Sequence, residues 1–179
     1  MARVLVVDDE PNMRWVLQEA LEHAGYAVLT AGSGEEALAT LAGNRVELIL
    51  LGYNTPRHNP PAPDHDALGD FHNALVMQAG AYQNGTFVVG IAKAGIEEGC
   101  ELIGGSVIVA PTGEVIARAS TLGDELILAR CDLDWTRSYK ETVFNFARHR
   151  EPEQYRMIVE RKGAVPPDGA RSFFDSGSI

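Results

Sequence analysis

The chain changes character within Val46-Glu47-Leu48-Ile49-Leu50-Leu51-Gly52-Tyr53-Asn54-Thr55-Pro56. Its first six residues include five apolar side chains and follow a Gly-Asn pair, which predicts a short strand buried on both faces of a parallel sheet. Four prolines at positions 56–63 predict a stiff, irregular loop directly afterwards. The residues before and after this strand are therefore interpreted separately.

Residues 1–51 predict a β-α-β-α-β unit with parallel strands. Apolar runs at 3–7, 26–31 and 46–51 alternate with two helical patterns. Pro11 opens the first helix and Gly25 ends it, and a Ser33–Glu36 capping box opens the second. Short links between such elements imply right-handed crossovers. The first helix is expected to bury one apolar face, made by Met13, Val16, Leu17, Ala20, Leu21 and Ala24.

Two acids, Asp8 and Asp9, follow the first predicted strand. Open α/β sheets place their ligand sites at the carboxyl ends of parallel strands. Two carboxylates at such an end can share a hard divalent cation such as Mg²⁺, which prefers oxygen ligands. A solvated acidic loop is the alternative interpretation. We therefore treat Asp8 and Asp9 as candidate metal ligands.

Three stretches together resemble the first half of a response-regulator receiver domain: Val4-Leu5-Val6-Val7-Asp8-Asp9-Glu10-Pro11, Ala31-Gly32-Ser33-Gly34-Glu35-Glu36-Ala37 and Leu48-Ile49-Leu50-Leu51. The resemblance implies that Asp8 and Asp9 help to hold Mg²⁺. It also implies a phosphoryl-accepting aspartate directly after the third strand, where this chain has Gly52. Glycine has no carboxylate, and the switch Thr/Ser and Lys of the family have no recognisable counterparts. A phosphorelay module is therefore an alternative function that we expect to be non-phosphorylatable.

Residues 52–150 predict a second set of α/β elements. The expected elements are a helix from an Asp64 cap to Gln83, a strand at 87–92, a hairpin of 106–110 and 114–117 joined by Pro-Thr-Gly, a strand at 125–132, and a helix from an Asp134 cap to about Phe146. Beyond Arg150 the chain becomes polar, and residues 163–179 are expected to form a mobile arm.

This second part resembles N-carbamoyl-D-amino-acid amidohydrolases (D-carbamoylases) of the nitrilase superfamily, over residues 47–167. The resemblance is carried by Gly52-Tyr53-Asn54-Thr55-Pro56-Arg57-His58-Asn59-Pro60-Pro61, Met77-Gln78-Ala79-Gly80-Ala81-Tyr82-Gln83-Asn84-Gly85, the segment from Ser106 to Gly113, and Phe144-Asn145-Phe146-Ala147-Arg148-His149-Arg150. It implies an N-carbamoyl-D-amino-acid-like ligand and a homo-oligomer. It also implies that Asn54 and Thr55 lie beside the ligand carboxylate and that His72 lies near the pocket wall.

The same resemblance implies catalysis by a cysteine nucleophile, a glutamate base and a lysine that stabilises the oxyanion. In the family these residues precede the Gly-Tyr-Asn-Thr-Pro segment, but residues 1–51 of this chain contain no cysteine and no lysine. Cys100 follows two acids, which disfavour a reactive thiolate, and Cys131 lies in an apolar run typical of a core residue. We therefore predict no catalytic residue and no required cofactor.

A metal site made by His58, His65 and His72 is disfavoured, because a spacing of seven on a loop is unspecific. The formal net charge of −10 disfavours nucleic acid and anionic membranes as partners. No apolar run approaches the roughly 18 residues of a membrane span. Two cysteines and the absence of a signal-peptide pattern favour the cytoplasm.

The sequence thus predicts a chimeric, layered α/β sheet. Residues 1–51 are expected to be a receiver-like half domain, joined to residues 52–150 as the C-terminal half of a carbon–nitrogen hydrolase, and residues 151–179 to be a polar arm. The second part would supply half of a nitrilase-type α-β-β-α sandwich.

Overall fold

A computed structural model describes residues 2–160 of this 179-residue chain. The chain divides into two compact units, Met1–Asn145 and Phe146–Ile179. Of the second unit, the described part comprises α5 (Phe146–His149), the 3-10 helix η2 (Pro152–Tyr155) and α6 (Arg156–Glu160). Among residues 2–160, no helix has both the length and the apolar character that a membrane span requires. The predicted arm at 163–179 lies outside the described residues.

The first unit is built on a mixed six-stranded sheet with the order β2-β1-β3-β4-β7-β8. The first four strands in that order are parallel to their neighbours, and β7 and β8 join the sheet antiparallel. The strands are β1 (Arg3–Val7), β2 (Ala27–Ala31), β3 (Leu48–Tyr53), β4 (Phe87–Ala92), β7 (Val107–Val109) and β8 (Val115–Arg118). A separate antiparallel hairpin, β5 (Ala94–Glu97) and β6 (Cys100–Ile103), was not predicted.

The strand at the junction of the two parts belongs to both. Along one edge of β3, Leu48 to Leu51 pair with Val4 to Val7 of β1. Along the other edge, Leu48 to Tyr53 pair with Phe87 to Ala92 of β4. The layered α/β prediction is therefore confirmed, with one unbroken sheet across the junction.

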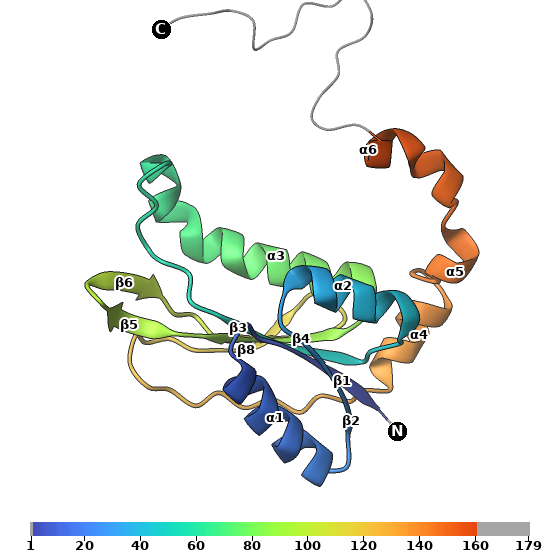
Figure 1. The fold of residues 1–179 in the computed structure, drawn as a ribbon, viewed down its shortest axis with the longest axis horizontal. Coiled ribbons are helices and arrows are strands. Elements are labelled where there is room, and N and C mark those ends of the chain that lie inside the picture. Colours follow the sequence, from blue (N-terminus) through green and yellow to red (C-terminus); the bar gives the residue numbers. More distant parts are fainter. Residues whose placement is uncertain (1, 161–179) are drawn as a thin grey trace, which may run out of the picture. The chain divides into compact units, whose positions relative to one another are not determined.

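Helices lie on both faces of this sheet. Helix α1 (Pro11–His23) lies on one face, and α2 (Gly34–Gly43) and α3 (Gly69–Asn84) lie on the other (Figure 1). The predicted cap of α2 is confirmed, since the Ser33 hydroxyl accepts a hydrogen bond from the Glu36 amide at 3.1 Å. The Glu36 carboxylate in turn accepts from the Gly32 amide at 2.7 Å, so both acceptors satisfy free N–H groups where the helix begins.

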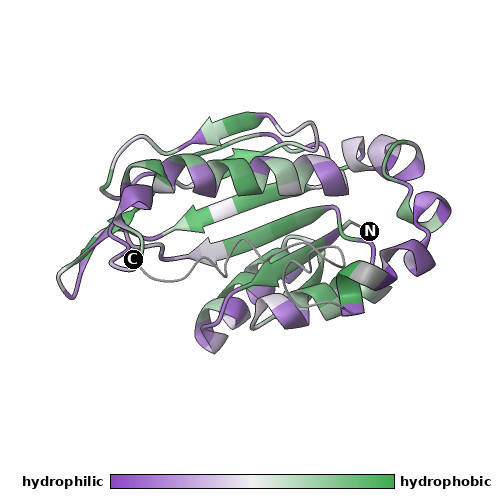
Figure 2. Cartoon of the chain, turned by 90° about the horizontal axis from the view of Figure 1, so that it is seen from above, coloured by the Kyte–Doolittle hydropathy of each residue, from purple (hydrophilic) through white to green (hydrophobic). Residues whose placement is uncertain are grey.

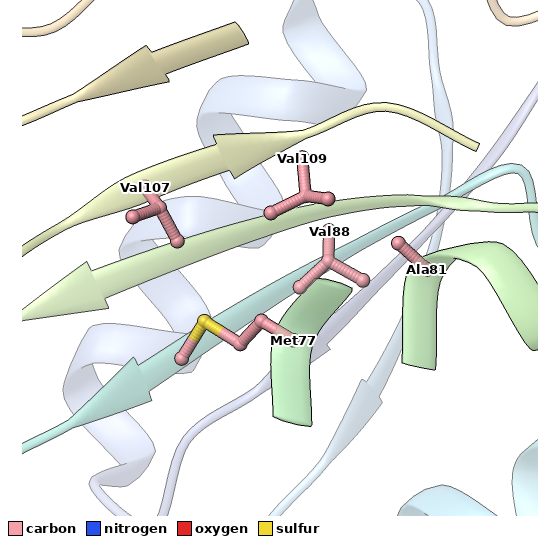
Figure 3. Close-up of a cluster of buried hydrophobic side chains, with 5 residues drawn as sticks. All are labelled: Met77, Ala81, Val88, Val107 and Val109. Atoms are coloured by element: carbon pink, nitrogen blue, oxygen red, sulfur yellow. The ribbon is translucent and has the colours of Figure 1, made fainter. Parts of the chain in front are cut away.

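Two apolar clusters hold α2 and α3 on the sheet. Under α2, Leu5 and Ala31 pack with Ala37 and Val46. Under α3, Met77 and Ala81 of the helix meet Val88, Val107 and Val109 of the sheet (Figure 3). Figure 2 shows hydrophobic strands beside helices of mixed hydropathy. The core therefore spans both parts of the chain on this face.

The opposite face is covered less completely, which corrects the expectation for α1. None of its residues is buried, and Met13 and Val16 are 45% and 52% exposed. Helix α1 packs mainly against β1 and β2, which leaves the outer part of its apolar side in solvent.

Three other predicted elements need correction. Residues 125–132 form no strand, because no neighbouring strand in the described part of the chain pairs with them. The helix expected from Asp64 begins as a 3-10 helix, η1 (Pro63–Leu68), because the Asp66 carboxylate bonds back to the Asn59 amide at 2.8 Å. The helix after Asp134 is α4 (Trp135–Glu141) and ends well before Phe146.

Candidate functional site

The sheet has a topological switch point between β1 and β3. The chain leaves β1 through α1 to reach β2 on one side, and leaves β2 through α2 to reach β3 on the other. Helices α1 and α2 lie on opposite faces of the sheet (Figure 1). Doubly wound sheets bind ligands at such a point, outside the carboxyl ends of the strands, which here are β1 and β3. Asp8 and Asp9 follow β1 at this edge, and Gly52 lies near the end of β3.

Asp8 is held in a defined position at the switch point. Its Oδ1 accepts a hydrogen bond from the Glu10 amide at 2.8 Å, and its backbone carbonyl accepts from Nη1 of Arg14 at 2.5 Å. Oδ2 faces Gly52 so closely that a Cβ atom at position 52 would overlap with it. Asp9 beside it is exposed. The switch point therefore presents one oriented carboxylate, one exposed carboxylate and no side chain from β3.

This donor set fits a divalent cation only in part. Two carboxylates with water can bind Mg²⁺, which keeps several waters in most protein sites. Within residues 2–160, no group of three or more His, Cys, Asp or Glu side chains is arranged to hold a metal ion. The Arg14 guanidinium also lies at this edge and places a positive charge beside Asp8. Metal binding at Asp8 and Asp9 stays a prediction.

The residues predicted to bind a carboxylate lie in two places. Asn54 and Thr55 directly follow β3, at the same sheet edge as Asp8. The Thr55 carbonyl accepts a hydrogen bond from the Ile103 amide at 3.1 Å, which ties this segment to β6, while the Asn54 side chain is exposed. His72 lies in the first turn of α3, where its ring contacts His65 with centroids 6.2 Å apart. Among the described residues, no hydrogen bond or ring contact joins His72 to Asn54 or Thr55.

A cleft of about 460 Å³ lies near this segment and was not predicted. Arg57 and Arg118 supply its positive charges, and its other lining residues include Asp70, Gly105, Ser120 and Thr121. Arg57 is paired with Glu101 at 2.8 Å and lies 4.0 Å from the Asp70 carboxylate. Arg118, by contrast, pairs with no carboxylate in the described part of the chain. The cleft therefore contains an exposed guanidinium without an ion-pair partner, in addition to the Asp70 carboxylate.

Tyr53 joins β3 to the wall of this cleft. Its hydroxyl donates to the Gly105 carbonyl at 3.2 Å and accepts from Nδ2 of Asn73 at 2.9 Å. Burial raises the pKa of Tyr53, although the Asn73 hydrogen bond acts in the opposite direction. The phenol therefore stays neutral and fixes the backbone at Gly105. The sequence offered no signal for Arg118, because its position depends on how β8 pairs with β7.

The two cysteines lie in different surroundings. Cys100 is exposed at the turn of the β5–β6 hairpin, opposite Glu97, and the Glu97 carboxylate forms an ion pair with Lys93. Thiol, carboxylate and ammonium thus share one hairpin, but none of them lines the described cavities. Cys131 is half-buried, and burial raises the pKa of its thiol. Neither cysteine therefore has the enclosed, cation-activated setting of a catalytic nucleophile.

Lys140 is a half-buried cation that the sequence did not single out. Its ammonium donates a hydrogen bond to the Val46 carbonyl, next to the junction strand. Burial lowers the pKa of Lys140 to about 8, although the negative charge of Glu47 opposes this shift. The ammonium joins α4 to the start of β3 and is not directed into the Arg118 cleft.

Comparisons with known proteins find similarities for both parts of the chain. The family model described as carbon–nitrogen hydrolase matches residues 15–141, which is more than half of the chain. The structure resembles the carbon–nitrogen hydrolase of Helicobacter pylori G27 with a TM-score of 0.56 and 20% identity, over 71% of this chain and 45% of that chain. At this identity the resemblance shows the fold alone.

Curated relatives match the receiver-like part. The transcriptional regulatory protein AruR of Pseudomonas aeruginosa is 51% identical over 59 residues, which is 30% of this chain and 24% of that protein. The alkaline phosphatase synthesis transcriptional regulatory protein PhoP of Bacillus subtilis is 44% identical over 55 residues, which is 31% of this chain and 23% of that protein. The chain thus spans about a quarter of the length of these regulators and less than half of the hydrolase.

Proposed function

Because the chain belongs to the carbon–nitrogen hydrolase family, we propose that it is a ligand-binding piece of such an enzyme that does not hydrolyse its ligand. The ligand class is an N-carbamoyl-D-amino acid, recognised through its carboxylate. The receiver-like β-α-β-α-β unit acts as a cap that completes the sheet in place of the missing hydrolase half. Two free cysteines fit a reducing compartment such as the cytoplasm.

The unpaired guanidinium of Arg118 is the observation that carries the proposed binding. Arginine binds carboxylates through two parallel N–H donors, and an arginine without an internal partner can bind a ligand anion. Arg57 at the same cleft already forms an ion pair with Glu101, so it attracts a ligand anion less strongly than Arg118 does. In this proposal Asn54 and Thr55 lie beside the ligand carboxylate, and His72 lies near the pocket wall.

Binding is tested by titration calorimetry with N-carbamoyl-D-phenylalanine and with its carboxamide, which lacks the negative charge. We expect the acid to bind and the carboxamide to bind at least about tenfold more weakly, since charge-assisted hydrogen bonds contribute about 1.5–3 kcal/mol. Arg118→Met should cause a similar loss. Arg137→Met is the matched control, because Arg137 is an exposed arginine on α4 that does not line this cleft. Equal binding of acid and carboxamide, or full binding by Arg118→Met, contradicts the proposal.

The separation of the thiols from the cleft supports the absence of hydrolysis. Cys100 lies on an exposed hairpin, and Cys131 is not among the residues that line the Arg118 cleft. We expect no ammonia release from N-carbamoyl-D-amino acids above the level of heat-denatured protein. Ammonia release that iodoacetamide or Cys100→Ser abolishes would contradict this expectation, and the binding experiment would still stand on its own result.

A phosphorelay module is the alternative function, and the lack of a side chain at Gly52 bears on it. Without a carboxylate at position 52, acetyl phosphate has no acceptor at the switch point. We expect no acid-stable or hydroxylamine-sensitive phosphate on the protein after incubation with acetyl phosphate and Mg²⁺. Any Mg²⁺ held by Asp8 and Asp9 would neutralise charge at this edge. Incorporated phosphate would favour the alternative over the hydrolase-derived function.

A further inference from the structure

The segment Asp124-Glu125-Leu126-Ile127-Leu128-Ala129-Arg130 joins β8 to α4 and has no partner strand. It contains no helix, turn or bend, and the ribbon of Figure 1 draws it as an uncoiled connection. No hydrogen bond joins the backbone of residues 126–131 to any other described residue. Figure 1 shows this connection running beneath the sheet, on the face that α2 and α3 leave uncovered. An extended segment with free N–H and C=O groups is a template for strand pairing.

Side chains along this segment alternate as they do in a strand. Ile127 and Ala129 are half-buried, and Ala129 lines a cavity with Phe87 of β4. Leu126 and Leu128 on the other side are 82% and 79% exposed. A period of two is typical of a strand, and a row of exposed apolar side chains marks a contact surface.

The charges at the two ends of the segment are opposite and unpaired. Asp124 and Arg130 are exposed, as the two leucines are, and neither forms an ion pair within residues 2–160. Arg130 also borders the cavity that Ala129 and Phe87 line. Glu125 accepts hydrogen bonds from the Ser120 and Thr121 amides at 2.9 Å each, which fixes the beginning of the segment. The free charges are therefore available to a partner.

This order of residues is complementary to itself in one antiparallel register. When Ile127 lies opposite Ile127 of a second copy, Leu126 lies opposite Leu128 and Asp124 lies opposite Arg130, twice by symmetry. A shift of the register by two residues would place Asp124 opposite Asp132 and Leu126 opposite Arg130. A parallel arrangement would place each charge opposite its like.

We propose that residues 124–130 form the interface between two copies of this chain, paired as antiparallel strands about a twofold axis at Ile127. Pairing satisfies the free backbone groups, brings Leu126 of each copy into lateral contact with Leu128 of the other, and neutralises Asp124 and Arg130. This gives the homo-oligomer predicted from the sequence a specific surface, independent of the ligand site at Arg118.

The first experiment measures association of the full chain by sedimentation velocity over a range of concentrations. Wild type should form a dimer, and Leu128→Asp should raise the dissociation constant at least tenfold. Val76→Asp is the matched control, because Val76 is 70% exposed on α3 and lies outside the segment. Circular dichroism verifies that each variant is folded. A monomeric wild type, or equal effects of the two substitutions, would overturn the proposal.

The second experiment tests the register through the charges. Asp124→Arg places two like charges opposite each other in the dimer, and so does Arg130→Asp, so each single variant should associate at least tenfold more weakly. The double variant Asp124→Arg/Arg130→Asp restores opposite charges and should dimerise as wild type does. Failure of the double variant to regain association would refute this register.

A disulfide experiment tests the same register by geometry. In a background with Cys100→Ser and Cys131→Ser, chains carrying Leu126→Cys are mixed with chains carrying Leu128→Cys and oxidised. Opposite residues in a strand pair are close enough for a disulfide, and diagonal ones are at the limit. The mixture should cross-link faster than either variant alone. Faster cross-linking of Leu128→Cys with itself would exclude the twofold axis at Ile127.

Discussion

Gly52 determines what the acidic edge of the sheet can do. In β3 it is the residue that faces Oδ2 of Asp8, and it contributes no oxygen. The switch point therefore has the position of a metal site but one side-chain ligand fewer than a three-carboxylate site would have. The two acids that remain, Asp8 and Asp9, are adjacent in sequence and accessible, so a bound cation would keep most of its water.

Restoring a carboxylate at this position gives a direct test. A Cβ at position 52 displaces the Asp8 side chain whatever the residue. Beyond this, the carboxylate of Gly52→Asp should destabilise the protein in EDTA by about 1–2 kcal/mol, because like charges that meet near the surface repel by a few kcal/mol before solvent screening. Millimolar Mg²⁺ should recover this loss by linkage, since a cation that binds only the folded state stabilises it. Thermal unfolding with EDTA and with Mg²⁺ measures both effects.

The control for Gly52→Asp is Gly80→Asp on α3, where an added Cβ meets no atom within 4 Å. That variant adds the same charge away from the acid pair, and we expect its stability to be independent of Mg²⁺. If Gly52→Asp also proved insensitive to Mg²⁺, Asp8 and Asp9 would not be metal ligands.

Lys140 predicts how stability depends on pH. Burial lowers the pKa of its ammonium to about 8 in the folded chain, against 10.5 as the ordinary value. Between these values the unfolded chain binds more protons than the folded chain, so stability rises with pH in this window. Below pH 8 the buried charge opposes folding by a constant amount. Urea unfolding at several pH values between 7.5 and 10.5 measures this contribution.

Removing the titrating group isolates the contribution of Lys140 from those of tyrosines and other lysines. Lys140→Met keeps the length and apolar stem of the side chain but has no ammonium. As the pH rises, the unfolding free energy of wild type should increase relative to that of Lys140→Met. A difference that stays constant with pH would show that Lys140 titrates at its ordinary value.

At the level of elements, the end of α3 is fixed by close packing against α4. Gly85 follows the helix with φ of +53°, in the left-handed region that favours glycine, and its amide bonds to the Tyr82 carbonyl at 3.1 Å. Tyr82, Tyr139 and Phe144 pack around it, with the Tyr82 and Phe144 rings perpendicular at 5.0 Å. This contact joins α3 to α4 and brings Lys140 to the junction strand.

Alanine substitutions at Gly85 and Gly25 distinguish two free-energy costs at the end of α3. One is the strain of a positive φ, and the other is the close packing against α4. A Cβ at Gly85 would lie 2.6 Å from Cβ of Tyr139, whereas a Cβ at Gly25 would meet nothing within 4 Å, although Gly25 also has a positive φ of +89°. Gly25→Ala should cost about 1 kcal/mol for the backbone alone. Gly85→Ala should cost clearly more, on the order of 2–4 kcal/mol, because Tyr139 must move as well. Equal costs in urea unfolding would mean that α4 packs loosely.

Elements with continuous apolar runs were predictable because burial on both faces leaves a strong pattern. The strand at 3–7 matches β1, and the strand at 87–92 matches β4. The hairpin of β5 and β6 was missed, because its turn at Glu98 and Gly99 is acidic and most of its residues are exposed. Residues 125–132 are rich in apolar side chains and predicted a strand, which the structure does not form. A strand also needs a neighbour, and local sequence does not specify one.

Only some residues of the candidate site could be predicted from the sequence, namely those whose position follows from the order of strands and helices. Asp8, Asp9, Asn54 and Thr55 follow parallel strands, so their common sheet edge could be inferred from the order of elements. The Arg118 cleft could not, because it depends on how β8 pairs with β7 and on the hydrogen bond from Tyr53 to Gly105. His72 was assigned by resemblance, and its contact with His65 follows from a 3-10 turn that the sequence pattern did not indicate.

At the level of the whole molecule, β3 joins the receiver-like and the hydrolase-like parts of the chain into one structure. Receiver-like β1 and hydrolase-like β4 pair with its two edges, and Lys140 from the far end of the first unit bonds to the carbonyl of Val46 just before it. The core under α2 and the core under α3 both include residues close to this strand. Residues 1–145 should therefore unfold in one cooperative transition.

Native-state hydrogen exchange tests this coupling. Leu5 of β1 is fully buried, and Leu5→Ala should cost about 3 kcal/mol. If the sheet opens as one unit, the amides of β4 lose protection by the same factor as those of β1, on the order of a hundredfold, although β4 does not touch β1. Leu38→Ala on α2 is the control, since Leu38 is 71% exposed and its truncation should leave both strands unchanged. A loss confined to β1 and β2 would mean that the receiver-like part opens alone, and that the shared strand aligns the two parts without coupling their stability.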